Sequence, residues 1–376
     1  FRRTSSRVEL MNYVNSKITN KNPEQCLKEI KNFLKIIKKL GEGSFGNVFL
    51  GEIGPIRLAI KQGKTKKESI THPYSNEYGD WEEINILNNI IRPIIENGMC
   101  PNLPLLYTNF YCPTCDFTFY SSRARSACIT GLTELAAGGD LKKFLNSSSI
   151  SEEDAYIALF HLLAGIHALQ NYGVFHNDIK SENMLVYDVE PGGFYEYIIN
   201  GKPYYVPNIG KLFIINDFGV SMSLMPRYGY GAFRYIYKRS DSYMDLGKHF
   251  VFIYKDQVMP FFVNNVKPSK NIEYKGYKGT IADVMQSKVI AGGIGMRLKN
   301  NRVMVDKSSA NPEYFNYNRN RYEPLVPDVF NEKDVAPPSE FTVDILDSLY
   351  TFVGDYPRSS QRSNHSSTKI PTKMKN

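Results

Sequence analysis

The chain has 376 residues, 42% of them hydrophobic and 13% aromatic, and its formal net charge is +8. That length suits one large domain or two of ordinary size, and the apolar content is sufficient for a substantial core. The start of the chain is basic and polar, without the apolar stretch of a signal peptide. We also find no uninterrupted apolar run of about 18 residues. These features argue against a membrane span and predict a soluble protein inside the cell, in the cytoplasm.

Basic residues gather near the end of the chain, where residues 356–376 mix lysine and arginine with serine and asparagine. Such a composition is typical of a solvated, disordered tail. The alternative is a surface that meets acidic substrates, nucleic acid or anionic lipid. Charge alone does not choose between these, and nothing else in the sequence indicates nucleic acid.

Five cysteines are spread unevenly along the chain, at Cys26, Cys100, Cys112, Cys115 and Cys128. An odd, uneven set does not match a secreted disulfide framework, so we expect reduced thiols. The pair Cys112-Pro-Thr-Cys115 has the spacing of half a zinc site. A structural Zn²⁺ held by Cys100, Cys112, Cys115 and Cys128 is the alternative.

Hydrophobic spacing predicts the elements in chain order. A helix is expected over residues 23–34, with Asn22 as the N-cap and Pro23 at the first helical position. Strands follow at 36–40, 47–51 and 56–61, then a helix at 81–91 and a strand at 128–135. The order of strands and helices indicates an α+β fold.

The second half opens with a strong helix prediction. Residues 151–172 form it, with Ser151 and Asp154 as an approximate capping box. Its apolar stripe consists of Ala155, Leu159, Leu162, Leu163, Ile166 and Leu169. Farther on, residues 195–205 predict a β-hairpin that turns at Asn200-Gly201. A small sheet-based lobe and a larger helical lobe, joined near residues 136–140, are therefore expected.

A glycine-rich segment, Gly41-Glu-Gly43-Ser-Phe-Gly46, is the first motif with chemical meaning. Glycines at these offsets let main-chain N–H groups approach phosphate oxygens. The pattern alone also fits a dinucleotide-binding turn, which runs from a strand into a helix. Here strand-like segments flank it on both sides, and Val48 follows two places after the last glycine. That context favours a phosphate-covering lid.

A lysine ends the next strand, in Leu58-Ala-Ile-Lys61. Such a lysine needs anionic partners, and ATP phosphates together with one carboxylate would supply them. Glu83, on the helix that follows, is the expected carboxylate. The alternative is a lysine that simply extends to solvent from the strand end.

The strongest motif is His176-Asn-Asp178-Ile-Lys180-Ser-Glu-Asn183, a polar loop between apolar segments. In it Asp178 can accept a hydroxyl proton, Lys180 can hold a γ-phosphate and Asn183 can ligate a metal ion. Downstream, an apolar strand delivers Asp217-Phe-Gly219, and Asp217 suits a Mg²⁺ that bridges phosphates.

These motifs, in this order, resemble the eukaryotic protein kinase superfamily over residues 33–355. The resemblance implies a bilobal fold with a small β-rich N-lobe holding one main helix (33–136) and a larger, mostly helical C-lobe (137–355). It implies ATP in the cleft, Mg²⁺ (or Mn²⁺ in its place) and protein substrates. Thr133 would be the gatekeeper, with Glu134 and Leu135 at the adenine. Leu40, Val48, Ala59 and Leu185 would sandwich the base, and Lys180 is similar to the lysine of serine/threonine kinases.

Among the branches of the superfamily, the motifs resemble casein kinase 1 most. The richness of the chain in Asn, Ile, Lys and Tyr is also similar to that of kinases of large DNA viruses. If the protein is viral, its place would be the host cell or the virion. Residues 1–32 would form an N-terminal extension with a helix, and residues 187–210 an insert. The sequence departs from the family pattern at Asn177, where an arginine is usual, and at Ser242, where an aspartate is expected between Asp241 and Asp245. Loop-phosphorylation control and peptide binding are therefore not carried over.

Two other classes stay open. A pseudokinase would bind without catalysing, although Lys61, Asp178, Asn183 and Asp217 are all present. A small-molecule kinase of the aminoglycoside or choline type also has a His-x-Asp loop, but the glycine-rich segment, Lys180 and Asp217-Phe-Gly argue against it. Phosphorylation of peptides rather than metabolites would discriminate.

Overall fold

The computed structural model describes residues 4–18, 22–26, 29–43, 46–75, 79–114, 127–147, 150–172, 174–176, 181–219 and 221–223. It also describes short pieces at 271–274, 277–280, 313–316, 321–324, 346–347 and 350. Asp178, Lys180, Asn177, Cys115, Ser242 and the tail from 356 onward lie outside these residues.

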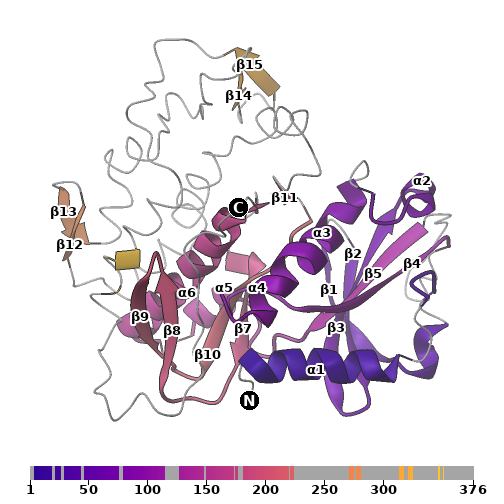
Figure 1. Ribbon diagram of the computed structural model, residues 1–376, viewed down its shortest axis with the longest axis horizontal. Coiled ribbons are helices and arrows are strands. Elements are labelled where there is room, and N and C mark those ends of the chain that lie inside the picture. Colours follow the sequence, from indigo (N-terminus) through magenta and orange to yellow (C-terminus); the bar gives the residue numbers. More distant parts are fainter. Residues whose placement is uncertain are drawn as a thin grey trace.

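A five-stranded antiparallel sheet forms the N-lobe, in the order β1-β2-β3-β5-β4 (Figure 1). Its strands are β1 (Lys35–Gly43), β2 (Gly46–Ile53), β3 (Ile56–Thr65), β4 (Leu106–Cys112) and β5 (Ala127–Glu134). The strands expected at 36–40, 47–51, 56–61 and 128–135 are confirmed. β4 was not predicted from the sequence, because most of its side chains are buried and no polar alternation marks it.

One continuous helical run crosses this sheet and confirms the helix expected at 81–91. It consists of α3 (Glu82–Ile86), the π-turn η3 (Leu87–Ile91) and α4 (Arg92–Glu96). Pro93 has no N–H to donate to the carbonyl four residues back, which disturbs the regular ladder. The Arg92 N–H instead bonds to the Leu87 carbonyl, five residues back. A short helix α2 (Lys67–Thr71) and the 3-10 turn η2 (Gly79–Trp81) precede the run.

The helix expected over residues 23–34 is wrong. Residues 22–26 are instead extended and lie along β4: the Gln25 N–H donates to the Tyr111 carbonyl at 2.9 Å, and the Tyr111 N–H donates to the Pro23 carbonyl at 2.8 Å. Only a 3-10 turn, η1 (Ile30–Asn32), remains. A short isolated helix is only marginally stable. The open edge of β4 instead offers hydrogen-bond partners to the main-chain N–H and carbonyl groups of these residues.

The helix of the N-terminal extension is α1 (Thr4–Lys17), which lies against β4 and α4 (Figure 1). It buries Arg7, Met11 and Val14, and Ile18 follows just beyond its end. These four positions recur at intervals of three and four residues, so they share one face of a helix. The extension therefore packs as part of the N-lobe.

The C-lobe begins with α5 (Leu141–Leu145), capped by Asp140, and α6 (Glu152–Asn171). The predicted capping box is confirmed, since the Asp154 N–H donates to Ser151 Oγ and the Ser151 N–H to the Asp154 carboxylate. The predicted apolar stripe of α6 is buried throughout. Below it lie β6 (Val174–Phe175), η4 (Ser181–Asn183), β7 (Met184–Asp188), β10 (Lys211–Ile215) and β11 (Met222–Ser223), with β7 paired to β10 and β6 to β11.

The predicted hairpin is also confirmed, as β8 (Phe194–Ile199) and β9 (Lys202–Pro207). Asn200 and Gly201 take positive φ angles of 50° and 77°, as a two-residue hairpin turn requires. The hairpin packs on α6, with the rings of Phe160 and Tyr197 at 5.5 Å. Farther along, β12 (Asn271–Tyr274) pairs with β13 (Tyr277–Thr280), and β14 (Glu313–Asn316) with β15 (Arg321–Pro324).

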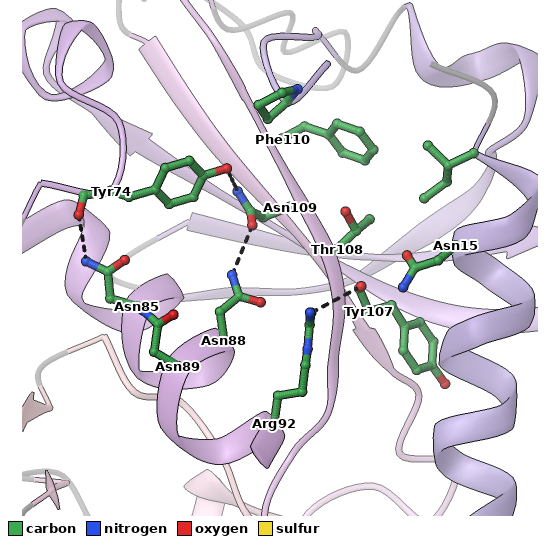
Figure 2. A pocket seen from close by; sticks show the side chains of 12 residues that line it. Asn15, Tyr74, Asn85, Asn88, Asn89, Arg92, Tyr107, Thr108, Asn109 and Phe110 are labelled. Atoms are coloured by element: carbon green, nitrogen blue, oxygen red, sulfur yellow. Dashed lines mark hydrogen bonds between the residues drawn. The ribbon is translucent and has the colours of Figure 1, made fainter. Parts of the chain in front are cut away.

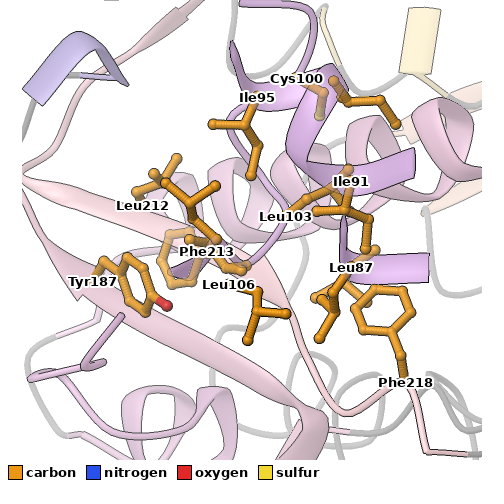
Figure 3. Packing of buried hydrophobic residues seen from close by; sticks show 14 of the residues in the cluster. Leu87, Ile91, Ile95, Cys100, Leu103, Leu106, Tyr187, Leu212, Phe213 and Phe218 are labelled. Carbon is orange, nitrogen blue, oxygen red and sulfur yellow. The ribbon is translucent and has the colours of Figure 1, made fainter. Parts of the chain in front are cut away.

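Side chains from both lobes meet in one buried cluster, so the two lobes share a core (Figure 3). The labelled members include Leu87, Ile91, Ile95, Leu103, Leu106, Tyr187, Leu212, Phe213 and Phe218. The architecture is the expected bilobal α+β fold. Whether the C-lobe is mostly helical rests on residues outside the described part.

The expectation of reduced thiols is wrong for Cys26 and Cys112, which form a disulfide. Pairing of residues 22–26 with β4 brings their Cα atoms to 4.8 Å. The described residues show no zinc site: Cys112 is in the disulfide, Cys100 lies buried beside Asn102 and the Ala164 carbonyl, and Cys115 lies outside the described part of the chain. In the described part of the chain, no group of three or more His, Cys, Asp or Glu side chains could hold a metal ion. No helix there is long and apolar enough to cross a membrane.

Candidate active site

Lys61 is the centre of a charged cluster between the lobes. Its Nζ lies 2.6 Å from Glu83 Oε1 on α3 and 2.7 Å from Asp217 Oδ1 just after β10. The expected contact between Lys61 and Glu83 is therefore present. Burial alone would lower the pKa of Lys61, but Glu83 and Asp217 more than offset it and hold this pKa above its ordinary value. Lys61 consequently presents a permanent positive charge.

Asp217 has an unusual backbone. Its φ is +68°, in the left-handed region that residues other than glycine rarely adopt. Burial would raise the pKa of its carboxyl, but the Lys61 ammonium outweighs that effect and keeps the pKa below its ordinary value. Such a conformation costs on the order of 1–3 kcal/mol, and it persists only where the surroundings impose it.

The neighbours of Asp217 supply that constraint. The Asn216 N–H donates to the Asn183 carbonyl at 2.8 Å, and His176 Nε2 donates to the Asn216 carbonyl at 2.9 Å. The ring of Phe218 packs edge-on against His176, with centroids 4.9 Å apart. Buried His176 thus fixes the residue on each side of Asp217.

Asn183 lies beside Asp217 because of strand register. β7 and β10 are antiparallel with Met184 opposite Ile215, so the residues just beyond this end of the pair face each other. Asn183 is 7% exposed. The main chain of Asn183 is therefore a neighbour of Asn216, the residue before Asp217, although more than thirty positions separate them in the sequence. Asp178 and Lys180, in the same polar loop, belong to the residues that are not described.

The glycine-rich segment forms the end of the β1–β2 hairpin, with Gly43 opposite Gly46. Gly46 has φ +149°, and a Cβ there would lie 2.1 Å from the Gln62 carbonyl oxygen, so only glycine fits. Gly41, by contrast, faces open space, with no atom within 4 Å of an added Cβ. The hairpin therefore packs closely against β3 at Gly46, whereas the space beside Gly41 is unfilled.

Four apolar side chains predicted to sandwich a base are partly exposed. Val48, Ala59 and Leu185 are half-buried, and Leu40 is 45% exposed. Apolar side chains left open beside a charged cluster suit a ligand with a flat apolar part and an anionic part.

Comparison with known families now decides the relationship. The model of the protein kinase domain matches residues 34–244, more than half of the chain. The chain belongs to the protein kinase family. The chain is 29% identical over 241 residues to the "Probable serine/threonine-protein kinase 380R" of Invertebrate iridescent virus 6, and the match covers 58% of this chain and 43% of that protein.

Two further relatives have similar names. The "Putative serine/threonine-protein kinase 019R" of Frog virus 3 is 30% identical over 204 residues, which cover 50% of this chain and 24% of the relative. A protein of Saccharomyces cerevisiae, "Fatty acyl-CoA synthetase and RNA processing-associated kinase 1", is 29% identical over 160 residues. The match covers 39% of this chain and 16% of the yeast protein. The chain thus spans less than half the length of these relatives.

The predicted hinge of the kinase has one property that the sequence did not reveal. Thr133 pairs with Ala59 on β3 and Leu106 on β4, as the end of a central strand. The Glu134 carboxylate is buried and bonded to Arg7. The side chain itself has a structural partner.

Arg7 is the residue that sequence reasoning missed. It is 1% exposed, contacts both Glu134 oxygens at 2.8 and 2.6 Å, and donates to the Pro101 and Leu103 carbonyls at 2.7 and 2.6 Å. Burial opposes the charge, yet Glu134 keeps the pKa of Arg7 above its ordinary value. Arg7 lies outside the matched kinase domain. Its spacing from Met11 and Val14 was the signal that could have found it.

Proposed function

We propose that this chain is a serine/threonine protein kinase that transfers the γ-phosphate of ATP to hydroxyl groups of protein substrates, with Mg²⁺ as the metal ion and Mn²⁺ as an alternative. The observation that carries the proposal is the ion-pair cluster of Lys61 with Glu83 and Asp217. A cation held by two carboxylates, beneath a glycine-rich hairpin, is suited to polyphosphate.

The donor set fits both nucleotide and metal. The Asp217 carboxylate and the Asn183 amide are oxygen ligands of the kind that Mg²⁺ prefers, alongside phosphate oxygens. The bound ion would neutralise negative charge on the phosphates. Lys61 would bind the α- and β-phosphates, with Glu83 fixing its position. Val48, Ala59, Leu185 and the neighbouring Leu40 would contact the base, with the main chain of residues 133–135 at its edge.

The chemical step follows from the predicted loop. The substrate hydroxyl oxygen forms a bond to the γ-phosphorus while the bond from that phosphorus to the β–γ bridging oxygen breaks, and ADP leaves. Asp178 orients the hydroxyl and takes its proton, and Lys180 holds the transferred phosphate. The preference for serine and threonine rests on Lys180, two positions after Asp178, and on the names of the two viral relatives.

The test is transfer of labelled γ-phosphate, with Mg²⁺, to casein and to the chain itself, followed by identification of the labelled amino acid. Asp178→Asn and Asp217→Asn should lower the rate by at least about 10²-fold. Asp188→Asn is the matched control, because Asp188 is an exposed acid paired with Lys211 and away from the cluster. It should retain activity.

Two results would overturn the proposal. Equal labelling by Asp178→Asn and the unchanged chain would refute the catalytic assignment. Mg-ATP binding without any label on protein would instead favour a pseudokinase, or a small-molecule kinase if metabolites become labelled.

A further inference from the structure

One residue of the N-terminal extension contacts three parts of the kinase domain at once. The guanidinium of Arg7 bonds to both oxygens of Glu134 at the end of β5, and it donates to the Pro101 and Leu103 carbonyls in the connection between α4 and β4. Its Cζ also lies 5.8 Å from the centre of the Tyr187 ring on β7. Since β5 and β7 belong to different lobes, Arg7 lies where the lobes join.

The ion pair lies behind the proposed base site. Thr133 pairs with Ala59 across the sheet, so the two side chains share the face on which the base is expected. Neighbouring side chains of a strand point to opposite faces, so Glu134 points away from that face. Arg7 can therefore act on a bound base only through Glu134.

The side chain and the main chain of Glu134 are linked through one residue. The Leu105 N–H donates to the Glu134 carboxylate at 3.0 Å, and the Glu134 N–H donates to the Leu105 carbonyl at 3.4 Å. A carboxylate that changes its place therefore disturbs the main-chain bond as well. Glu134 is also the last residue of β5, so the predicted hinge continues from the point that this contact fixes.

The far end of the hinge is fixed by β7. The Gly138 N–H donates to the Val186 carbonyl at 3.0 Å, and the Val186 N–H donates to the Gly139 carbonyl at 2.9 Å. Residues 135–137 thus run between two anchored ends, and Arg7 holds the first of them.

The helical run α3–η3–α4 has its own attachment to the sheet. Arg92 of α4 donates to the Leu106 and Tyr107 carbonyls at 2.9 and 3.3 Å, and Figure 2 shows the bond to Tyr107. Neither bond involves Arg7. The run carries Glu83, so the ion pair that Glu83 makes beneath the glycine-rich hairpin should survive a change at Arg7.

From these contacts we propose that Arg7 is a positioning residue for the adenine-binding hinge: through Glu134 it fixes the main chain of residues 133–135 in the orientation that receives the base. The inference rests on the proposed function, in which these main-chain groups meet the adenine. It extends that function, because Arg7 lies outside the matched kinase domain and nucleotide affinity then depends on the N-terminal extension. Without its cation the Glu134 carboxylate stays buried at high cost, and its movement toward solvent turns the end of β5.

The experiment compares nucleotide binding and turnover in the full chain and in Arg7→Met. Calorimetry gives the dissociation constant of Mg-ADP, and phosphate transfer to casein gives KM for ATP and kcat. We expect Arg7→Met to raise the dissociation constant by about five- to tenfold, the range that one hydrogen bond to the base is worth. Since the base is bound alike before and during transfer, KM should rise and kcat at saturating ATP should change less than KM does.

Adenosine tests whether the effect lies at the base. It has no phosphate and cannot report on Lys61, so Arg7→Met should weaken adenosine and ADP by the same factor. Weaker ADP binding with unchanged adenosine binding would assign the effect to the phosphate side and contradict the proposal.

Met11→Ala is the matched control for loss of stability. Met11 is 3% exposed on the same face of α1, so its truncation weakens the packing of the extension and leaves the ion pair in place. Urea unfolding of both variants identifies the temperature at which each is folded. At that temperature Met11→Ala should bind ADP as the unchanged chain does.

Arg7→Lys keeps the charge without the planar fork of the guanidinium. We expect it to weaken ADP binding by a smaller factor than Arg7→Met, about two- to fourfold, since one charged contact to Glu134 remains. This variant decides the question if Arg7→Met does not fold: affinity equal to that of the unchanged chain would then contradict the proposal.

Two further results would overturn it: ADP binding by folded Arg7→Met equal to that of the unchanged chain, or an equal loss in Met11→Ala. An unchanged chain that binds neither ADP nor adenosine would overturn it together with the base site. A chain that binds nucleotide but transfers no phosphate would refute the kinase activity alone, and the binding comparisons would still decide the role of Arg7.

Discussion

Replacing Arg7 tests the strongest interaction that the N-terminal extension makes with the kinase domain. Arg7→Met keeps a long apolar side chain but removes the cation that contacts both oxygens of the Glu134 carboxylate, whose side chain is 0% exposed, while the Leu105 N–H still donates to that carboxylate at 3.0 Å. Breaking one partner of a buried ion pair costs about 3–5 kcal/mol, because the other charge stays buried. The Pro101 and Leu103 carbonyls lose their donor too.

The loss is large beside a typical domain stability of about 5–15 kcal/mol. Urea unfolding can follow it through the fluorescence of Trp81, the chain's single tryptophan, which is fully buried in the N-lobe. We expect the free energy of unfolding to fall by about 3–5 kcal/mol in Arg7→Met. Arg57→Met removes a cation that is 66% exposed and paired with Glu52, and should change it by less than about 1 kcal/mol.

The double variant Arg7→Met with Glu134→Leu separates charge from packing. Since it removes both charges, most of the lost stability should return. A single variant that unfolds at the same urea concentration as the unchanged chain would refute the reasoning. So would a double variant no more stable than the single one.

Three further predictions concern other parts of the chain. Lys61→Met should lower the rate of phosphoryl transfer by at least about 10²-fold. Lys35→Met, which changes a side chain that is 76% exposed, should leave the rate unchanged. Similar rates for the two variants would contradict the role of Lys61. Burial lowers the pKa of His161 to about 3 and that of His167 to about 4, so the unfolded chain binds protons more readily, and stability falls as the pH drops below about 6.5. Urea unfolding at pH 5.5 should show a loss of about 1.4 kcal/mol for each histidine relative to pH 7.5, and a variant with both replaced by Phe and Leu should lose correspondingly less. Cys26→Ser opens the Cys26–Cys112 disulfide and should cost about 2–4 kcal/mol; an unchanged unfolding midpoint after reduction of the native chain would argue against the bond.

Much of the fold could be predicted from the sequence, because the signals that define it act over a few residues. The α6 capping box joins Ser151 to Asp154, three positions apart, and the Asn200-Gly201 turn needs only its own two φ angles. The spacing of the glycine-rich segment, Lys61, the polar loop and Asp217 likewise identified the kinase family. Helix periodicity and motif spacing are local properties, so a sequence carries them explicitly.

Only the tertiary structure decided the rest. Residues 23–34 have helical spacing, yet the first of them are extended, because the open edge of β4 offers main-chain partners to Pro23 and Gln25. The left-handed backbone of Asp217 is imposed by Asn183 and His176, which the motif spacing does not reveal. Arg7 and Glu134 are 127 positions apart, and their pairing depends on α1 packing against the sheet. Contacts between distant segments depend on which surfaces meet after folding, and the sequence pattern of one segment does not specify its partner.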